Sequence, residues 1–398
     1  MRRRYLHFAA AFGCCFVICG MLVQPSLGMV NTSNHLSYRE APNDDPGWNF
    51  VGEMFNGTGV YLGDGWVITP YHVYRPRAEE ASIQLDQMYD EVPGTSKRIK
   101  FDTQADIDAD LIMFRINGDP NLYPVGSVPN VVEIRPEAIG TRPVATIIGT
   151  GFGRDDAPSP DPPPTGPLQT WDVGGQTYQG YDISDTRIKQ WGSNSVSVYG
   201  AVTPPGGYGT TEVLYSMFNQ SPARSEETQP VDKDSGGAAF IKRSGVWELS
   251  GLVIAMAAPE GYPHAELSLR EHAIYETGAM YADLSKYSDQ ISAIRLTPLP
   301  GDVDWNGRVD LRDFSLLRQT FGQTGPDLAA DFDQSGAVDD ADLDILQRNF
   351  GVISGNGVNW PDGVPLLAPV LAPEPATMFV LLVAAPLLLR SRKRRKTA

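Results

Sequence analysis

The sequence predicts an all-β domain followed by a small α-helical module, with a short apolar segment near each end of the chain. Between about residues 47 and 254, short runs of β-branched and aromatic residues alternate with turn residues, without amphipathic helices between them. Near residue 300 this pattern gives way to two acidic loops, each followed by apolar residues at helical spacing. A chain of 398 residues with 41% hydrophobic residues therefore fits two globular domains with terminal appendages.

Residues 1–28 have the pattern of a secretory signal peptide. Three arginines precede an apolar run from Phe8 to Val23, and we expect cleavage after Gly28. A membrane anchor is the alternative, because the run is near the short limit for spanning a bilayer. All three cysteines lie in this segment, so the mature protein would have no disulfide, catalytic thiol or cysteine-bound metal.

The other end of the chain, residues 356–398, has three parts in a fixed order. Pro373-Glu374-Pro375 is followed by an apolar stretch over residues 376–389 and then by a basic cluster. This order resembles the PEP-CTERM sorting signal of certain Gram-negative bacteria, which implies processing by an exosortase and transient membrane association. A tail-anchored protein is the alternative, although the stretch is short for a permanent span and contains Pro386.

The net charge excludes one class of partner. The chain carries a formal charge of −16, and both predicted terminal signals are basic, so the part between them is more acidic still. Such a surface repels nucleic acid phosphates and anionic membranes, and it favours divalent cations. We therefore expect no nucleic acid partner.

The first domain is predicted to consist of short strands. A proline-rich stretch over residues 155–166 predicts an exposed loop, a helical pattern over 281–295 closes the domain, and residues 298–300 read as a linker. The clearest strand candidates lie at residues 59–62, 65–68, 111–114, 144–148, 238–241 and 247–254.

Serine-type acyl transfer needs a hydroxyl nucleophile, an imidazole base and a carboxylate that orients the imidazole. Four histidines remain after the predicted signal cleavage, and His72 stands out because it follows a predicted strand directly. Asp110 precedes an apolar strand, and Ser235 lies in the sequence Asp-Ser-Gly-Gly. Each motif alone is more often structural, so their combination carries the prediction.

These three motifs together resemble the chymotrypsin/trypsin family. Thr-Pro-Tyr-His at residues 69–72 is similar to the family's Thr-Ala-Ala-His, residues 110–116 to its Asp-Ile-Ala-Leu-Leu block, and residues 234–237 to the core of Gly-Asp-Ser-Gly-Gly. The order His, Asp, Ser is also that of the family. The resemblance implies two six-stranded antiparallel barrels over residues 29–297.

The resemblance also implies roles for particular residues. Ser235 would be the nucleophile, His72 the general base and Asp110 its orienting carboxylate, while the backbone amides of Ser235 and Lys233 would form the oxyanion hole. Asp108 is a credible substitute for Asp110, because on a strand the two would face the same side. Protein or peptide would be the substrate.

Several residues depart from the family pattern. Lys233 stands where the family has glycine, Ile254 where a serine commonly supports the aspartate, and Ala255-Met256 where Trp-Gly binds substrate backbone. No activation site is evident, although signal removal would expose Met29 as a candidate partner for Asp234. The alternative to an active endopeptidase is therefore an inactive protease-like adhesion or scaffold protein.

The second domain, residues 298–355, contains two loops with oxygen-bearing side chains at calcium-loop spacing. Apolar residues after the loops repeat in step: Phe314 with Leu343, Leu317 with Leu346, and Phe321 with Phe350. Glycine occupies position 6 of each loop, and position 7 offers a backbone carbonyl. The candidate ligands are Asp302, Asp304, Asn306, Arg308, Asp310 and Asp313 in the first loop, and Asp331, Asp333, Ser335, Ala337, Asp339 and Asp342 in the second.

Duplicated loops with aspartate at position 12 look like the EF-hand-like repeats of type I dockerins. The resemblance implies about two Ca²⁺ ions and a cohesin-like partner at the cell surface. A calcium-rigidified spacer between the first domain and the anchor is an equally good interpretation. The sequence as a whole predicts an exported serine endopeptidase that carries a calcium-binding module.

Overall fold

The computed structural model describes residues 29–33, 35–118, 120, 122, 142–155, 168–204, 206–221, 224–325 and 328–354. The predicted signal peptide, nearly all of the proline-rich loop and the predicted C-terminal sorting signal lie outside these residues. Within them, no helix combines the length and apolar character needed to cross a membrane.

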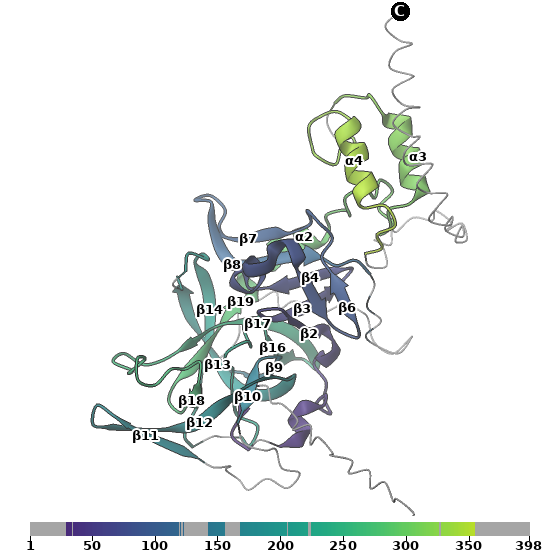
Figure 1. Ribbon diagram of the computed structural model, residues 1–398. Coiled ribbons are helices and arrows are strands. Elements are labelled where there is room, and N and C mark those ends of the chain that lie inside the picture. Colours follow the sequence, from purple (N-terminus) through teal and green to yellow (C-terminus); the bar gives the residue numbers. More distant parts are fainter. Residues whose placement is uncertain are drawn as a thin grey trace, which may run out of the picture.

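The first unit is a curled antiparallel sheet of seven strands (Figure 1). Trp66, Tyr61 and Phe114 are fully buried in its core, which explains why the strand-forming runs here contain so few polar residues. The strands are, in sheet order, β6 (Met88–Asp90), β5 (Ser82–Gln84), β2 (Val51–Met54), β3 (Gly57–Gly63), β4 (Trp66–Thr69), β8 (Ile107–Arg115) and β7 (Lys97–Asp102).

The second unit is a closed barrel of six antiparallel strands. Closure leaves no free edge around the barrel, and Ile147, Leu214 and Tyr281 are fully buried. The strands are, in order, β13 (Gln190–Val202), β14 (Thr211–Met217), β19 (Gly278–Asp283), β17 (Val246–Ala257), β16 (Ala238–Arg243) and β9 (Val144–Gly149).

Two smaller sheets flank the barrel. Strands β10 (Phe152–Arg154), β11 (Gln169–Val173) and β18 (His272–Ile274) all pair with β12 (Gln176–Arg187), and the β11–β12 hairpin projects outward in Figure 1. Strand β1 (Val30–Asn31) pairs with β15 (Thr228–Gln229), which buries the start of the described chain.

Short helices lie between and after the strands of the β units. They are η1 (Leu36–Arg39), η2 (Trp48–Phe50), α1 (Tyr71–Tyr74), η3 (Arg75–Glu80), η4 (Leu284–Lys286) and α2 (Ser288–Arg295). The helix expected over 281–295 is thus confirmed only from Ser288. Residues 281–283 instead complete β19, because they pair with β14 and β17 in the barrel.

The C-terminal module packs two helices, α3 (Leu311–Thr320) and α4 (Asp340–Arg348), around one apolar cluster. The three residue pairs that repeat in sequence all belong to this cluster. Val92 of the first unit joins it as well, so the module shares its core with the seven-stranded sheet.

The predicted fold class is confirmed, and so is each of the six strand candidates. One detail differs, because the first unit has seven strands in an open order where six in a closed barrel were expected. The two short strands β5 and β6 extend that sheet beyond β2.

Candidate active site and calcium loops

His72 and Asp110 lie in hydrogen-bonding contact. Strand β4 ends at Thr69, and Pro70 begins the one-turn helix α1, which places His72 next to β8. The ring Nδ1 of His72 is 2.7 Å from Asp110 Oδ2, and the backbone N–H of His72 donates to Asp110 Oδ1 at 3.0 Å. An ionised carboxylate only accepts, so this geometry favours a proton on Nδ1 and leaves Nε2 as the proton acceptor.

Asp108, the alternative to Asp110, has other partners. Its carboxylate is 2.7 Å from Lys100 Nζ and 3.5 Å from Arg98 Nη2. Asp108 is about one-third exposed, whereas Asp110 is 1% exposed. The histidine therefore pairs with the more buried of the two carboxylates.

Ser235 lies in a tight turn immediately before β16. The Gly237 N–H donates to the Asp234 carbonyl at 2.7 Å, which closes the turn. The Ser235 carbonyl accepts from Thr58 N–H at 2.7 Å, and the Gly236 N–H donates to the Val253 carbonyl at 2.7 Å. Ser235 itself is partly exposed while its neighbours Asp234 and Gly236 are buried, so the turn fixes this serine from both β units.

Two glycines allow this turn to approach the helix that carries His72. A Cβ on Gly236, whose φ is 91°, would lie 1.7 Å from the Thr58 carbonyl oxygen and 3.1 Å from Pro70 Cδ. A Cβ on Gly57 would meet both the Ser235 carbonyl and the side chain of Val73. The Ser235 turn therefore lies beside the start of α1, in a space that only glycine can fit.

Lys233 adopts a backbone conformation that favours glycine. Its φ of 70° lies in the left-handed region, which costs a residue with a side chain about 1–2 kcal/mol. Lys233 Nζ donates to Asn56 Oδ1 at 2.8 Å, and the Thr58 hydroxyl donates to the Lys233 carbonyl at 3.4 Å. These contacts hold the segment despite the strain.

Asp234 is fully buried beside the start of the described chain. Its carboxylate accepts from the N–H groups of Gly151 (2.8 Å) and Val231 (2.9 Å). Burial raises the pKa of Asp234 to about 7, against the opposing effect of these hydrogen bonds. A Cβ on Gly149 would lie 2.2 Å from Asp234 Oδ1 and 3.1 Å from Met29 Cε, so Met29 and Asp234 flank the same glycine.

A threonine that no sequence motif indicated contacts the aspartate. The Asp110 N–H donates to Thr211 Oγ1 at 2.9 Å, across 101 residues of sequence. Ile254, where the resemblance implied a serine beside the aspartate, is 4% exposed and packs in the core.

Each calcium-type loop gathers three carboxylates. Ligand oxygens of Asp302, Asp304 and Asp313 lie within 4.8 Å of one another, and the same holds for Asp331, Asp333 and Asp342 in the second loop. In both loops these carboxylates occupy positions 1, 3 and 12, as a loop that encloses a hard cation requires. Both loops place a non-glycine residue at position 4, Trp305 or Gln334, in the left-handed conformation.

The remaining predicted ligands have different placements. Asp310 and Asp339 cap α3 and α4 through their side chains, so they stand outside the two carboxylate clusters. Asn306 Oδ1 accepts from the Arg308 N–H at 2.9 Å, and Ser335 Oγ donates to the Ala337 carbonyl at 3.3 Å. Asp313 and Asp342 also accept backbone N–H groups, which ties each cluster to the following helix.

The chemistry of the first cluster fits a divalent cation. Burial, together with the neighbouring carboxylates, raises the pKa of Asp302 to about 7 and that of Asp313 to about 6. A cation would remove both penalties, because it neutralises charges that the protein has taken out of water. The two loops thus hold two acidic triads consistent with Ca²⁺ sites.

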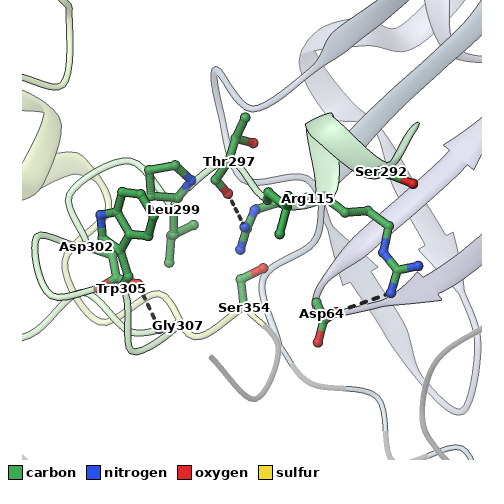
Figure 2. Close-up of a pocket in the computed structure, with 12 residues that line it drawn as sticks. Asp64, Arg115, Ser292, Thr297, Leu299, Asp302, Trp305, Gly307 and Ser354 are labelled. Carbon is green, nitrogen blue, oxygen red and sulfur yellow. Dashed lines mark hydrogen bonds and ion pairs between the residues drawn. The ribbon is translucent and has the colours of Figure 1, made fainter. Parts of the chain in front are cut away.

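The first calcium loop also lines a cavity at the junction with the seven-stranded sheet (Figure 2). The cavity has a volume of about 430 Å³, and Arg115, Asp302, Trp305 and Ser354 are among its walls. Arg115 Nη2 donates to the Thr297 carbonyl at 2.5 Å, which ties the residue just before the linker to β8.

Comparison with known proteins assigns the C-terminal module. The family model of the dockerin type I domain matches residues 300–351. No curated protein sequence matches the chain. Among solved structures, the chain is similar to neuropsin, a serine protease expressed in the limbic system of mouse brain, at 15% identity and a TM-score of 0.38, over 64% of this chain and 97% of that one. The C-terminal module of this chain is therefore a type I dockerin domain.

Proposed function

We propose that this protein is an exported serine endopeptidase with a calcium-binding dockerin domain. The observation that carries the proposal is the His72–Asp110 pair, in which one buried carboxylate binds both the ring and the backbone of the histidine. The turn with Ser235 lies beside the same one-turn helix. This is the chemistry that serine acyl transfer requires.

In the proposed reaction, Ser235 Oγ attacks the scissile carbonyl while His72 Nε2 takes the hydroxyl proton. Asp110 stabilises the resulting imidazolium and keeps its orientation. The N–H groups of Ser235 and Lys233 stabilise the tetrahedral oxyanion. His72 then gives its proton to the leaving amine, and a water molecule, activated in the same way, hydrolyses the acyl-enzyme.

The end of β17 supports a polypeptide as substrate. Strand β16 pairs with β17 only as far as Leu252, and the next backbone contacts on that side come from the Ser235 turn itself. The segment from Ala255 to Ala257 pairs with β19 on its other side. An extended peptide could add to this edge through main-chain hydrogen bonds and thus pass the serine.

The calcium-binding module and the two terminal segments indicate where the protein would act. Asp302, Asp304 and Asp313 in one loop, and their counterparts in the other, would hold Ca²⁺, which would neutralise the carboxylates and rigidify the module. A cohesin-like protein is the proposed partner of the module. The predicted signal peptide and PEP-CTERM segment would deliver the protein to the cell surface through an exosortase-type enzyme.

Labelling with a fluorophosphonate probe tests the proposed activity. We expect the wild-type protein to label and to hydrolyse casein, and Ser235→Ala to lose both because no acylating hydroxyl remains. The matched control is Ser193→Ala. Ser193 is a buried serine of the barrel that takes part in no proposed step, so this variant should still label. A correctly folded wild-type protein that fails to label would refute the proposal.

The second candidate function is an inactive protease-like adhesion or scaffold protein. The left-handed backbone at Lys233 favours it, because a side chain there strains the segment that would form the oxyanion hole. Absence of casein hydrolysis, together with calcium-dependent binding of a cohesin-like partner, would support this function.

A further inference from the structure

One guanidinium joins the two β units at the His72–Asp110 pair. Arg98, in β7 of the seven-stranded sheet, donates from Nη2 to the Ala109 carbonyl at 2.8 Å and to the Tyr208 carbonyl at 2.7 Å. Ala109 directly precedes Asp110, and Tyr208 belongs to the loop that leads into β14 of the barrel. Arg98 therefore bridges the strand that carries the aspartate and a loop of the other unit.

The same guanidinium also contacts the histidine's side of the pair. Arg98 Cζ lies 3.5 Å from the centroid of the Tyr71 ring, and Tyr71 directly precedes His72. The Tyr208 ring packs against the His72 ring, with centroids 5.7 Å apart. Arg98 thus contacts Tyr71 and Ala109, the residues that precede His72 and Asp110. It also holds the backbone of Tyr208, whose ring packs on the imidazole.

The loop segment from Tyr208 to Thr211 follows β8 closely. The Thr210 N–H donates to the Asp108 carbonyl at 2.9 Å, and Thr211 Oγ1 accepts from Asp110 N–H at 2.9 Å. A Cβ on Gly209 would lie 2.2 Å from the Asp108 carbonyl oxygen, so the backbones are in direct contact. The Arg98 hydrogen bond to Tyr208 fixes the end of this segment.

We propose that Arg98 is a positioning residue, which holds the Tyr208–Thr211 segment against His72 and Asp110 and so fixes the orientation of the imidazole. The inference rests on the proposed function for its catalytic consequence. Its structural consequence, a well-ordered hydrogen bond between His72 and Asp110, can be measured independently of activity. A planar guanidinium can stack on the Tyr71 ring while its Nη2 donates to both carbonyls, whereas a lysine ammonium has no planar face to stack.

Kinetics of three variants test this role. We expect Arg98→Ala to lower kcat about 10- to 100-fold with a smaller change in KM, because misplaced catalytic groups slow the chemical step. Arg98→Lys should recover only part of kcat, and added guanidinium ion should partly rescue Arg98→Ala. The matched control is Lys100→Ala. Among the described residues, the Lys100 ammonium pairs with Asp106 and with the same Asp108, and not with Tyr71 or Tyr208, so kcat should stay near wild type.

A spectroscopic readout separates this proposal from the proposed function. In protein labelled with ¹⁵N-histidine, the Nδ1–H of His72 should give a downfield proton signal that is absent in His72→Ala and weakened in Arg98→Ala. His272, whose Nδ1 is 2.9 Å from Asp182, is an internal reference that should not change. This signal is informative even if the wild type fails to label.

Two outcomes would overturn the inference. The first is an Arg98→Ala protein that keeps the wild-type His72 signal, together with wild-type kcat if the protein is active. The second is a Lys100→Ala protein that loses as much kcat, or as much of the His72 signal, as Arg98→Ala. That result would assign the effect to the charge near Asp108. If Arg98→Ala does not fold, Arg98→Lys with an unchanged signal decides against the proposal.

Discussion

Lys233 is the residue at which local backbone preference and tertiary structure conflict most directly. Glycine would adopt its φ of 70° without strain, whereas lysine needs support from the surrounding structure. That support comes from Asn56, which accepts from Lys233 Nζ at 2.8 Å. Because Asn56 lies in the turn between β2 and β3, the first β unit stabilises a strained residue of the second.

Asp234 should make folding stability depend on pH. Its pKa of about 7 in the folded state lies above the value of about 3.9 in an unfolded chain, so the folded protein binds a proton more tightly. The stability that this proton contributes is fully present below about pH 4 and is lost as the pH rises to about 7, by up to ~4 kcal/mol. Urea unfolding of wild type and Asp234→Asn at several pH values measures the difference.

The asparagine variant is the reference for this effect because it cannot ionise. We expect the stability of wild type relative to Asp234→Asn to fall between pH 4 and pH 7 and to level off above. A constant difference across that range would show that Asp234 stays ionised in the folded protein. Since Met29 flanks the same glycine as Asp234, a free amine at Met29 should reduce the slope by favouring the carboxylate.

At the scale of elements, helix capping and calcium binding compete for the same residues. The sequence predicted Asp310 and Asp339 as calcium ligands from their loop position, but their side chains cap α3 and α4. Spacing alone cannot separate the two roles, because position 9 of the loop is also the N-cap of the helix that follows. The carboxylates at positions 1, 3 and 12 were predicted and do come together.

A pair of substitutions distinguishes a cap from a ligand. Serine caps helices nearly as well as aspartate, so Asp310→Ser should change the calcium affinity of the first loop little. Asp304→Asn removes a charge from the carboxylate cluster and should weaken binding about tenfold or more. Calorimetric titration with Ca²⁺ compares the two. Equal losses would indicate that Asp310 contacts the ion, directly or through water.

The sequence predicted elements well where the signal was local. Short runs such as residues 144–148 and 238–241 became barrel strands, in which most of their side chains are buried. The helix expected from residue 281 failed at its start, since pairing of Tyr281 with Leu214 and Val253 outweighs local helical periodicity.

At the scale of the whole molecule, the candidate site divides into predictable and unpredictable parts. Each of His72, Asp110 and Ser235 lies in a short motif that can be recognised in one stretch of sequence. Thr211 and Tyr208 carry no such motif, because they reach the pair only when the barrel packs on the sheet. Arg98 carries none either, because it reaches the pair through the pairing of β7 with β8 and through its hydrogen bond to Tyr208. The contacts that hold the site together are therefore tertiary contacts, between residues far apart in the sequence.

The dockerin domain is joined to the seven-stranded sheet on the side of its first calcium loop. The Gly118 N–H donates to the Ile353 carbonyl at 2.6 Å, and Gly65 packs so closely on Ser354 that a Cβ would meet its Oγ at 1.9 Å. The Ser354 N–H donates in turn to the Gly307 carbonyl within the first loop, at 2.9 Å. Calcium in this loop should therefore support the junction as well as the module.

Amide hydrogen exchange at Gly118 measures this coupling, because its N–H is bonded across the junction. Asp302 is buried at the junction, whereas the equivalent Asp331 is partly exposed in the second loop. We expect Asp302→Asn, or chelation of calcium, to speed exchange at Gly118 at least tenfold, and Asp331→Asn to do so much less. Exchange within the barrel, for example at Leu214, should not change in either variant and serves as the control. Unchanged protection of Gly118 after chelation would mean that the sheet and the dockerin domain stay joined without the ion, through the Gly118–Ile353 hydrogen bond and the Val92 contacts.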